Sequence, residues 1–221
     1  MLHKTRGIVF RFTKYGDTSI IVSIFTDLFG LQSYLVNGVR SKSGRGMISL
    51  YQPLTLLDLV VYHRENANLL RIKEAKCLHA YQHIHQDIRK TTIALFLNEV
   101  INKAVKDQSN AETIFGFLMR SFISLDQLDS VESFHLQFLI QLSRHLGFGV
   151  HDTREVLEGG AFTEEEDAAL RRLLDSGYAD CPDVPYARRR LLLEQLLSFY
   201  HRHLDTMTEI RSVEVLKEVL R

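Results

Sequence analysis

The side chains best suited to chemistry in this sequence are three cations in a loop of small residues. Residues 37–46 read Asn-Gly-Val-Arg-Ser-Lys-Ser-Gly-Arg-Gly, with Arg40, Lys42 and Arg45 and no acidic residue. Small residues let a backbone approach a phosphate closely, and Lys or Arg side chains displace the counterions around a polyanion. The loop therefore predicts a contact with phosphate groups. A solvated hairpin without a ligand is the alternative.

Further cations lie on or beside segments that read as strands, and we expect them to make secondary contacts. They are Arg6, Arg11, Lys14, Arg71 and Lys73. Aromatic residues lie between them, and an exposed ring can stack on a base without reading its sequence. These are Phe10, Phe12, Tyr15, Tyr34 and Tyr62. Aromatic residues in strands usually pack in a core, so we expect Phe10 and Phe12 to be buried, while both interpretations stay open for Tyr15.

No pattern typical of an enzyme active site occurs in the sequence. It lacks a phosphate-binding glycine loop, a dinucleotide-binding fingerprint, a nucleophile elbow and a zinc-protease His-Glu pair. The acidic run at 164–167 fits the first turn of a helix, where negative charge is favourable. The arginines at 188–190 begin a later helix, and either DNA contact or pairing with the acidic run explains them. We expect a non-enzymatic protein without a cofactor.

The histidines and cysteines do not complete a metal site. His79, His83 and His85 lie where strands give way to helices, but a zinc site needs three or four ligands and no cysteine or carboxylate pattern supplies the rest. The two cysteines, Cys77 and Cys181, exclude a disulfide framework and fit a reducing compartment. No apolar run approaches the ~20 residues of a membrane span, and no signal peptide is evident. We expect a soluble, cytoplasmic protein without a bound metal.

Charge is balanced over the whole chain but divided along it. Residues 1–80 carry 11 Lys and Arg against five Asp and Glu, a formal charge of +6, whereas residues 81–221 carry −6. A basic half of this kind indicates contact with nucleic acid. Chance scatter over two solvated surfaces is the alternative.

The spacing of apolar residues changes near residue 80. Before it, five short apolar runs separated by turn signals predict a small Greek-key β-barrel, with Ile8, Phe10 and Phe12 on one face of the first strand. After it, apolar residues recur every three or four positions and predict helices. We expect an α+β protein with a barrel domain at 1–80 and an all-α domain at 81–221.

Capping residues mark the ends of the expected helices. Thr163 and Glu166 have capping-box spacing, Gly147 suits a left-handed helix end, and Pro185 suits a first helical position. The helices are expected over 86–106, after Asn110, up to Gly147, from Thr163 to Gly177, from Pro185 past Phe199, and over 212–220.

Several motifs across residues 1–80 resemble the N-terminal domain of the RecO family of bacterial recombination mediators. Leu142 to Gly147, Leu191 to Leu204 and Arg211 to Leu216 resemble its helical half more loosely. The motifs of the first part are Thr5-Arg6-Gly7-Ile8-Val9, Tyr15-Gly16-Asp17, Ile24-Phe25-Thr26, Gly30-Leu31, Asn37 to Lys42 and Leu50-Tyr51-Gln52-Pro53-Leu54.

This resemblance implies an oligonucleotide-binding (OB) fold followed by a helical domain. It further implies binding of single- and double-stranded DNA, annealing of complementary strands, and action with RecR in loading RecA onto strands covered by single-strand-binding protein. Such a protein would be associated with the bacterial nucleoid. Many relatives carry a four-cysteine zinc module, whose ligands are missing here, so we expect a metal-free variable insert at 148–182.

The resemblance also implies that the helical domain receives the acidic C-terminal tail of single-strand-binding protein. An apolar groove rimmed by arginine would suit such a tail, and Arg120, Arg144 and Arg154 are the candidates. The alternative function is a protein-interaction scaffold without nucleic-acid contact. A metal-dependent nuclease finds no support, because no carboxylate cluster is evident.

Overall fold

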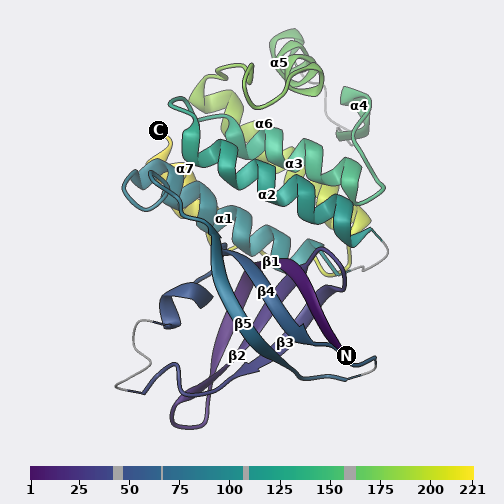
Figure 1. The fold of residues 1–221 in the computed structure, drawn as a ribbon. Coiled ribbons are helices and arrows are strands. Elements are labelled where there is room, and N and C mark those ends of the chain that lie inside the picture. Colours follow the sequence, from purple (N-terminus) through teal and green to yellow (C-terminus); the bar gives the residue numbers. More distant parts are fainter. Residues whose placement is uncertain (42–46, 66, 107–109, 157–162) are drawn as a thin grey trace. The chain divides into compact units, whose positions relative to one another are not determined.

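The computed structural model describes residues 1–41, 47–65, 67–106, 110–156 and 163–221. These residues form two compact units, of which the first comprises Met1–Tyr81 with Lys106–Arg120 and the second comprises Gln82–Val105 with Ser121–Arg221. A five-stranded barrel precedes a series of helices in the chain (Figure 1). The expected α+β class, with an OB-type barrel followed by helices, is confirmed.

All five expected strands are present and close into one barrel. They are β1 (Leu2–Tyr15), β2 (Ser19–Thr26), β3 (Gly30–Val36), β4 (Leu56–Tyr62) and β5 (Leu70–His79). Their order around the barrel is β1-β2-β3-β5-β4, and only the β3–β5 pairing is parallel. Closure satisfies the strand edges and separates an inner from an outer face, since successive side chains of a strand alternate.

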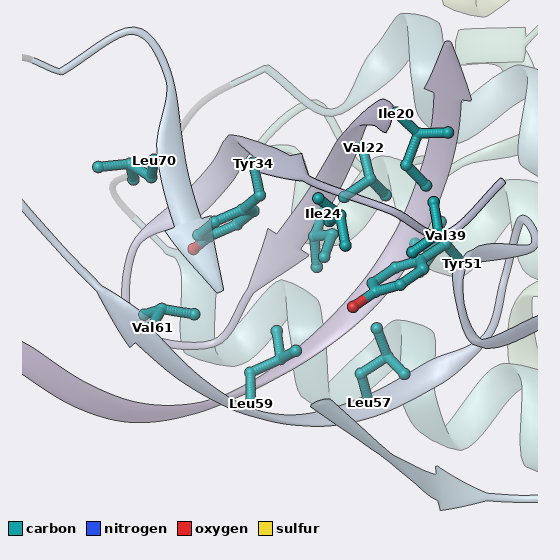
Figure 2. Packing of buried hydrophobic residues seen from close by; sticks show 12 residues of the cluster. Ile20, Val22, Ile24, Tyr34, Val39, Tyr51, Leu57, Leu59, Val61 and Leu70 are labelled. Carbon is teal, nitrogen blue, oxygen red and sulfur yellow. The ribbon is translucent and has the colours of Figure 1, made fainter. Parts of the chain in front are cut away.

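The inner face forms the apolar core of the barrel (Figure 2). Val22 and Tyr34 are register partners whose side chains are both fully buried inside it. Val39 joins the same core, as does Tyr51 from the short 3-10 helix η1 (Ile48–Tyr51). Burying one large apolar side chain contributes about 1.5–3 kcal/mol, so this core is the main support of the outer surface.

A bulge in β1 changes which residues share a face. The β1–β2 register shifts between Val9 and Arg11. Phe12 consequently packs against the core that contains Val9, whereas Ile8 and Phe10 are buried outside that core. The expectation that Ile8, Phe10 and Phe12 share one face was therefore wrong, because an extra residue in one strand reverses the alternation beyond it.

Two glycines in the barrel meet specific geometric demands. A Cβ at Gly7 would lie 2.5 Å from Ile24 Cγ2 and 3.0 Å from Leu59 Cδ1, so the core has no room for a side chain there. Gly16, in the turn between β1 and β2, has a φ of +54°, which glycine adopts without the strain of a Cβ.

The helices follow most of the expected caps, but Pro185 is the N-cap residue of α6 and not its first helical residue. They are α1 (Ile88–Ala104), α2 (Ala111–Gln127), α3 (Phe134–His145), α4 (Thr153–Val156), α5 (Glu164–Asp175), α6 (Tyr186–His203) and α7 (Val213–Val219). Thr163 and Glu166 form the predicted capping box of α5, and Gly147 has a φ of +88° after α3. None of the helices in the described ranges has the length and apolar character that crossing a membrane requires.

Two carboxylates organise the helical unit. Asp126, near the end of α2, accepts backbone N–H groups from Gln82, His83 and Ile84 at 2.8 Å each. Glu99 of α1 accepts the backbone N–H groups of Arg211 and Ser212, the residues that lead into α7. Each carboxylate thus fixes an irregular segment to a helix. Apolar packing alone does not orient such a segment.

Candidate nucleic-acid interface

One outward-facing row of residues crosses every strand of the barrel. We call it the cross-strand row, and its members are successive register partners. Because partners in a sheet point to the same side, and because the neighbouring pair Val22 and Tyr34 points inward, this row lies on the outer face. The row runs Thr13 (β1), Ile21 (β2), Leu35 (β3), Arg71 (β5), Tyr62 (β4) and Leu2 (β1).

Three of the predicted DNA-contacting cations lie on or beside this row. Arg71 belongs to it, Arg11 lies two residues before Thr13, and Lys73 lies two residues after Arg71. Strands β1 and β5 run in the same direction, so Arg11 and Lys73 flank the row on opposite sides. Among the described residues, the side chains of Arg11 and Arg71 have no hydrogen-bond or ion-pair partner, and Lys73 Nζ lies 3.8 Å from a Glu74 carboxylate oxygen.

The strands between these cations carry no charge on their outer face. Ser23 and Ser33 are partners on β2 and β3, and Ile21 and Leu35 are partners beside them. Strands lie about 4.8 Å apart, so the four steps along the row from Thr13 on β1 to Tyr62 on β4 cover about 19 Å of the outer surface. The result is a neutral floor bordered by cations, which suits a polyanion that lies across the strands.

The exposed aromatic residues also lie on this face. Tyr62 is 52% exposed and belongs to the row, and Tyr15 is 53% exposed and lies two residues after Thr13. Phe10 is buried, as expected. Tyr34 cannot stack on a base, because its ring lies inside the barrel core, where burial raises the pKa of its hydroxyl. Of the two interpretations for the strand aromatics, core packing therefore holds for Tyr34, which the register places on the inner face.

Arg40 has a structural task at the end of the β1–β2 hairpin. Its guanidinium donates to the Gly16 carbonyl at 3.1 Å, and its backbone N–H donates to the Thr18 carbonyl at 2.9 Å. Ser19 Oγ donates to Asn37 Oδ1 at 3.0 Å and holds the same two segments together. Arg40 is half-buried, so it supports the turn beside Tyr15 and still adds positive charge there. Lys42 and Arg45, also predicted to contact DNA, lie outside the described residues.

Arg6 and Lys14 are placed apart from the row. Arg6 Nε forms an ion pair with Asp27 at 2.8 Å, and its guanidinium lies over the Phe115 ring, 5.1 Å from the centroid. Burial raises the pKa of Asp27, but hydrogen bonds from Thr5 and Arg6 outweigh it and hold that pKa below its usual value. Lys14 is the partner of the inward-facing Ile20 and is exposed where β1 extends into the hairpin.

The candidate tail-binding arginines are divided between the two units, and two of them have structural partners in the helical unit. Arg144 donates to the Leu174 carbonyl at 3.0 Å. Arg154 forms an ion pair with Asp152 at 2.8 Å, and its hydrogen bonds hold the pKa of Asp152 far below the usual value. Arg120 is exposed on α2, in the part of that helix that belongs to the first unit.

A groove with a mixed polar and aromatic lining, which includes the carboxylate residue Glu155, lies in the helical unit. Its volume is about 470 Å³, and its lining includes Phe148, Phe199, Arg202 and His203. Phe148 stacks on His203 with ring centroids 5.0 Å apart, and the Arg202 guanidinium lies over Phe199. Sequence reasoning missed Arg202, although its spacing of three residues from Phe199 in a helix was a usable signal.

The remaining charged motifs have structural partners. Arg188 pairs with Glu165, and Arg190 pairs with Glu194 at 3.4 Å. Arg189 is buried and donates to the Val184 carbonyl at 2.8 Å. Of the two explanations for the arginines at 188–190, pairing with the acidic run therefore holds for Arg188.

The histidines between the strands and helices are dispersed. The His83 ring contacts the Asp126 carbonyl at 3.1 Å, and the His79 ring lies edge-on to Tyr81. Within the described part of the chain, no three His, Cys, Asp or Glu side chains gather in a way that could hold a metal ion.

Comparisons with known proteins place both halves in one family. Residues 1–81 match the family described as Recombination protein O N terminal, and residues 85–167 match Recombination protein O C terminal. A relative from Flavobacterium psychrophilum named DNA repair protein RecO is 33% identical over 233 residues, 98% of each chain. A relative of the same name from Bacteroides fragilis is 33% identical over 240 residues, 99% of each chain.

Proposed function

The chain belongs to the RecO family of DNA repair and recombination proteins, and from this premise we propose that its barrel binds single- and double-stranded DNA and anneals complementary strands. The observation that carries this proposal is the cross-strand row, which contains Arg71 and is flanked by Arg11 and Lys73. The neutral floor lies between Arg11 and Arg71, whose side chains have no ion-pair partner among the described residues, while Lys73 lies near Glu74. Such a surface can neutralise the charge of a phosphate backbone. Arg40 adds charge at the hairpin end, and we extend the interface to Lys42 and Arg45 from their sequence alone.

Annealing follows from the same electrostatics. Two strands repel each other until their phosphates are neutralised, and a protein that binds phosphates leaves the base edges available for pairing. The role of the barrel residues is to bring strands together, and we propose no bond-breaking step and no cofactor.

We further propose the partners that a recombination mediator requires. With RecR, the protein would promote RecA loading on strands covered by single-strand-binding protein. The groove of Phe148, Phe199, Arg202 and His203 offers aromatic surface beside a cation, which suits the acidic tail of single-strand-binding protein. Gly149 of the same groove packs against Arg144, one of the predicted tail-binding residues.

The proposal is tested by reversing the charges beside the row. We expect the Arg11→Glu, Arg71→Glu, Lys73→Glu triple variant to lose DNA affinity at low salt and to show a flatter dependence of log K on log salt. Arg172→Glu, an exposed charge reversal in the helical unit, is the control and should change neither. Wild-type protein that binds no oligonucleotide in dilute buffer would instead favour the protein-interaction scaffold.

A further inference from the structure

The two most exposed tyrosines of the chain lie on the same face of the barrel. The chain has eight tyrosines, and Tyr15 and Tyr62 are the two that expose more than half of their surface. Of the others, Tyr34 and Tyr51 pack in the barrel core, Tyr81 donates to the Leu54 carbonyl and Tyr200 donates to the Leu139 carbonyl. An exposed aromatic ring beside a cation offers a flat surface on which an unpaired base can stack.

We infer that Tyr62 and Tyr15 stack on unpaired DNA bases at the two ends of the cross-strand row. This inference rests on the proposed function and assigns the form of DNA that the face prefers. Tyr62 lies between Leu2 and Arg71 in the row, so its ring has an apolar neighbour on one strand and a cation on the other. Arg71 is therefore placed to hold the phosphate of the nucleotide whose base lies on Tyr62.

Tyr15 has a corresponding arrangement at the other end of the row. It is the last residue of β1 and the register partner of Ser19. The turn that follows it is fixed by the Arg40 guanidinium, which donates to the Gly16 carbonyl. The ring thus projects from a braced hairpin and has a cation beside the adjoining turn.

Stacking on these two rings discriminates between single-stranded and duplex DNA. In a duplex, the bases are already stacked and paired, so a surface tyrosine reaches backbone and groove edges but no open base face. The cations contact phosphates in both forms. The tyrosines therefore add affinity for single strands only, and the face acquires a preference that phosphate contacts alone do not give.

The span of the row sets the length of strand that can engage both rings. The path of about 19 Å along the row, from Thr13 on β1 to Tyr62 on β4, corresponds to about six nucleotides at the 3.4 Å spacing of a stacked strand. A more extended strand needs fewer. Oligonucleotides of two or three nucleotides should therefore reach one ring only, and the second ring should add little to their affinity.

The experiment compares Tyr62→Leu and Tyr15→Leu with Tyr62→Phe and Tyr15→Phe in the full chain. We expect each Leu variant to weaken binding of a single-stranded 12-mer (about twice the spanned length) by about 5- to 150-fold, the range for loss of one base stack. Affinity for a duplex of the same sequence should stay within about twofold. The Phe variants, which keep the ring, should bind both forms like wild type.

A second readout identifies the base itself. A series of 12-mers with one abasic position should bind wild type more weakly, and Tyr62→Leu should be insensitive to the abasic position that affects wild type most. Leu variants with unchanged single-strand affinity, or with equal losses for single strands and duplexes, would overturn the stacking assignment. If the charge-reversal variants bind like wild type, the proposed interface fails as well, so the two failures are distinguishable.

Discussion

Tyr62 on β4 and Arg71 on β5 are register partners with both side chains on the outer face of the barrel. Residues opposite each other in an antiparallel pair have Cβ atoms about 4.5–5.5 Å apart, so the proposed DNA interface brings the ring and the guanidinium to the same short stretch of ligand. Arg71 also pairs with Leu35 across the parallel β3–β5 contact, which continues the surface onto β3.

Arg71 and Lys76 provide a matched test of the row, since both are exposed cations on β5. Lys76 is the register partner of Asp58 and does not belong to the row. We expect Arg71→Ala to lower DNA affinity and to reduce the salt slope of duplex binding by about 0.9, the value for one lost phosphate contact. Lys76→Ala should leave the slope unchanged. Equal slopes in both variants, measured by fluorescence anisotropy between 50 and 200 mM salt, would argue against a specific phosphate path.

Arg40 should influence stability as well as binding. Arg40→Met removes the donor to the Gly16 carbonyl and is expected to destabilise the protein by about 0.5–1.5 kcal/mol. Arg40→Lys keeps the charge without the planar fork, so it should lower Tm while leaving the salt slope of DNA binding unchanged. A Lys variant with wild-type Tm would show that the guanidinium geometry does not brace the turn.

Two glycines of the first unit should respond to alanine with opposite signs. At Gly7 the added methyl group would meet Ile24 at 2.5 Å inside the core, so Gly7→Ala should cost about 1–3 kcal/mol. At Gly116 in α2 the methyl group meets only the guanidinium of Arg120, at 3.2 Å. Alanine favours a helix over glycine by up to about 1 kcal/mol, so Gly116→Ala should stabilise. Urea unfolding measures both, and a neutral Gly7→Ala would mean that the core adapts.

The sequence predicted the elements well because their signals are local. The capping box of Thr163 and Glu166, the glycine after α3 and the turn at Gly16 each depend on residues a few positions apart. The face of each strand residue was harder to predict. Three register shifts in β1 and β5 interrupt the alternation. One lies between Val9 and Arg11 of β1, and two lie in β5, where Ile72 and Glu74, and Cys77 and His79, oppose consecutive β4 residues.

These register shifts determine which cations lie on the same face of the barrel. Arg6 and Arg11 were equivalent in the sequence, but Arg6 is paired with Asp27 while Arg11 faces outward next to the row. The Asp27 contact joins residues about twenty positions apart, and no local pattern indicates it. Grouping cations on one face requires the register of all five strands, which depends on packing of the whole barrel.

Asp126 should be among the most sensitive polar positions of the helical unit. Burial raises the pKa of its carboxyl, but three backbone N–H donors outweigh it and keep the pKa below the usual value. Asp126→Asn would set an amide N–H₂ against a backbone N–H and should cost roughly 2–4 kcal/mol. Asp129→Asn, at an exposed position three residues on, should stay within about 0.5 kcal/mol of wild type. Similar unfolding free energies for the two variants would contradict this role.

Glu99 should give the protein a component of stability that disappears in acid. Burial raises the pKa of Glu99, but hydrogen bonds from Ser212 and Arg211 and the contact with Lys103 bring it to about 2, against a usual value of 4.5. Because the folded state favours the deprotonated carboxylate, its contribution is complete above pH 4.5 and is lost as the pH falls toward 2.

Glu99→Gln keeps one acceptor oxygen but removes the charge, so at pH 7 it should unfold about 1–3 kcal/mol more easily than wild type. The difference between the two proteins should shrink as the pH falls through the window from 4.5 to 2, because wild-type Glu99 then becomes neutral too. Glu218→Gln, at an exposed position of α7 without a described partner, is the control and should track wild type at every pH. If the difference in unfolding free energy between Glu99→Gln and wild type stays constant across this window, side-chain packing and not the carboxylate charge holds α7 to α1.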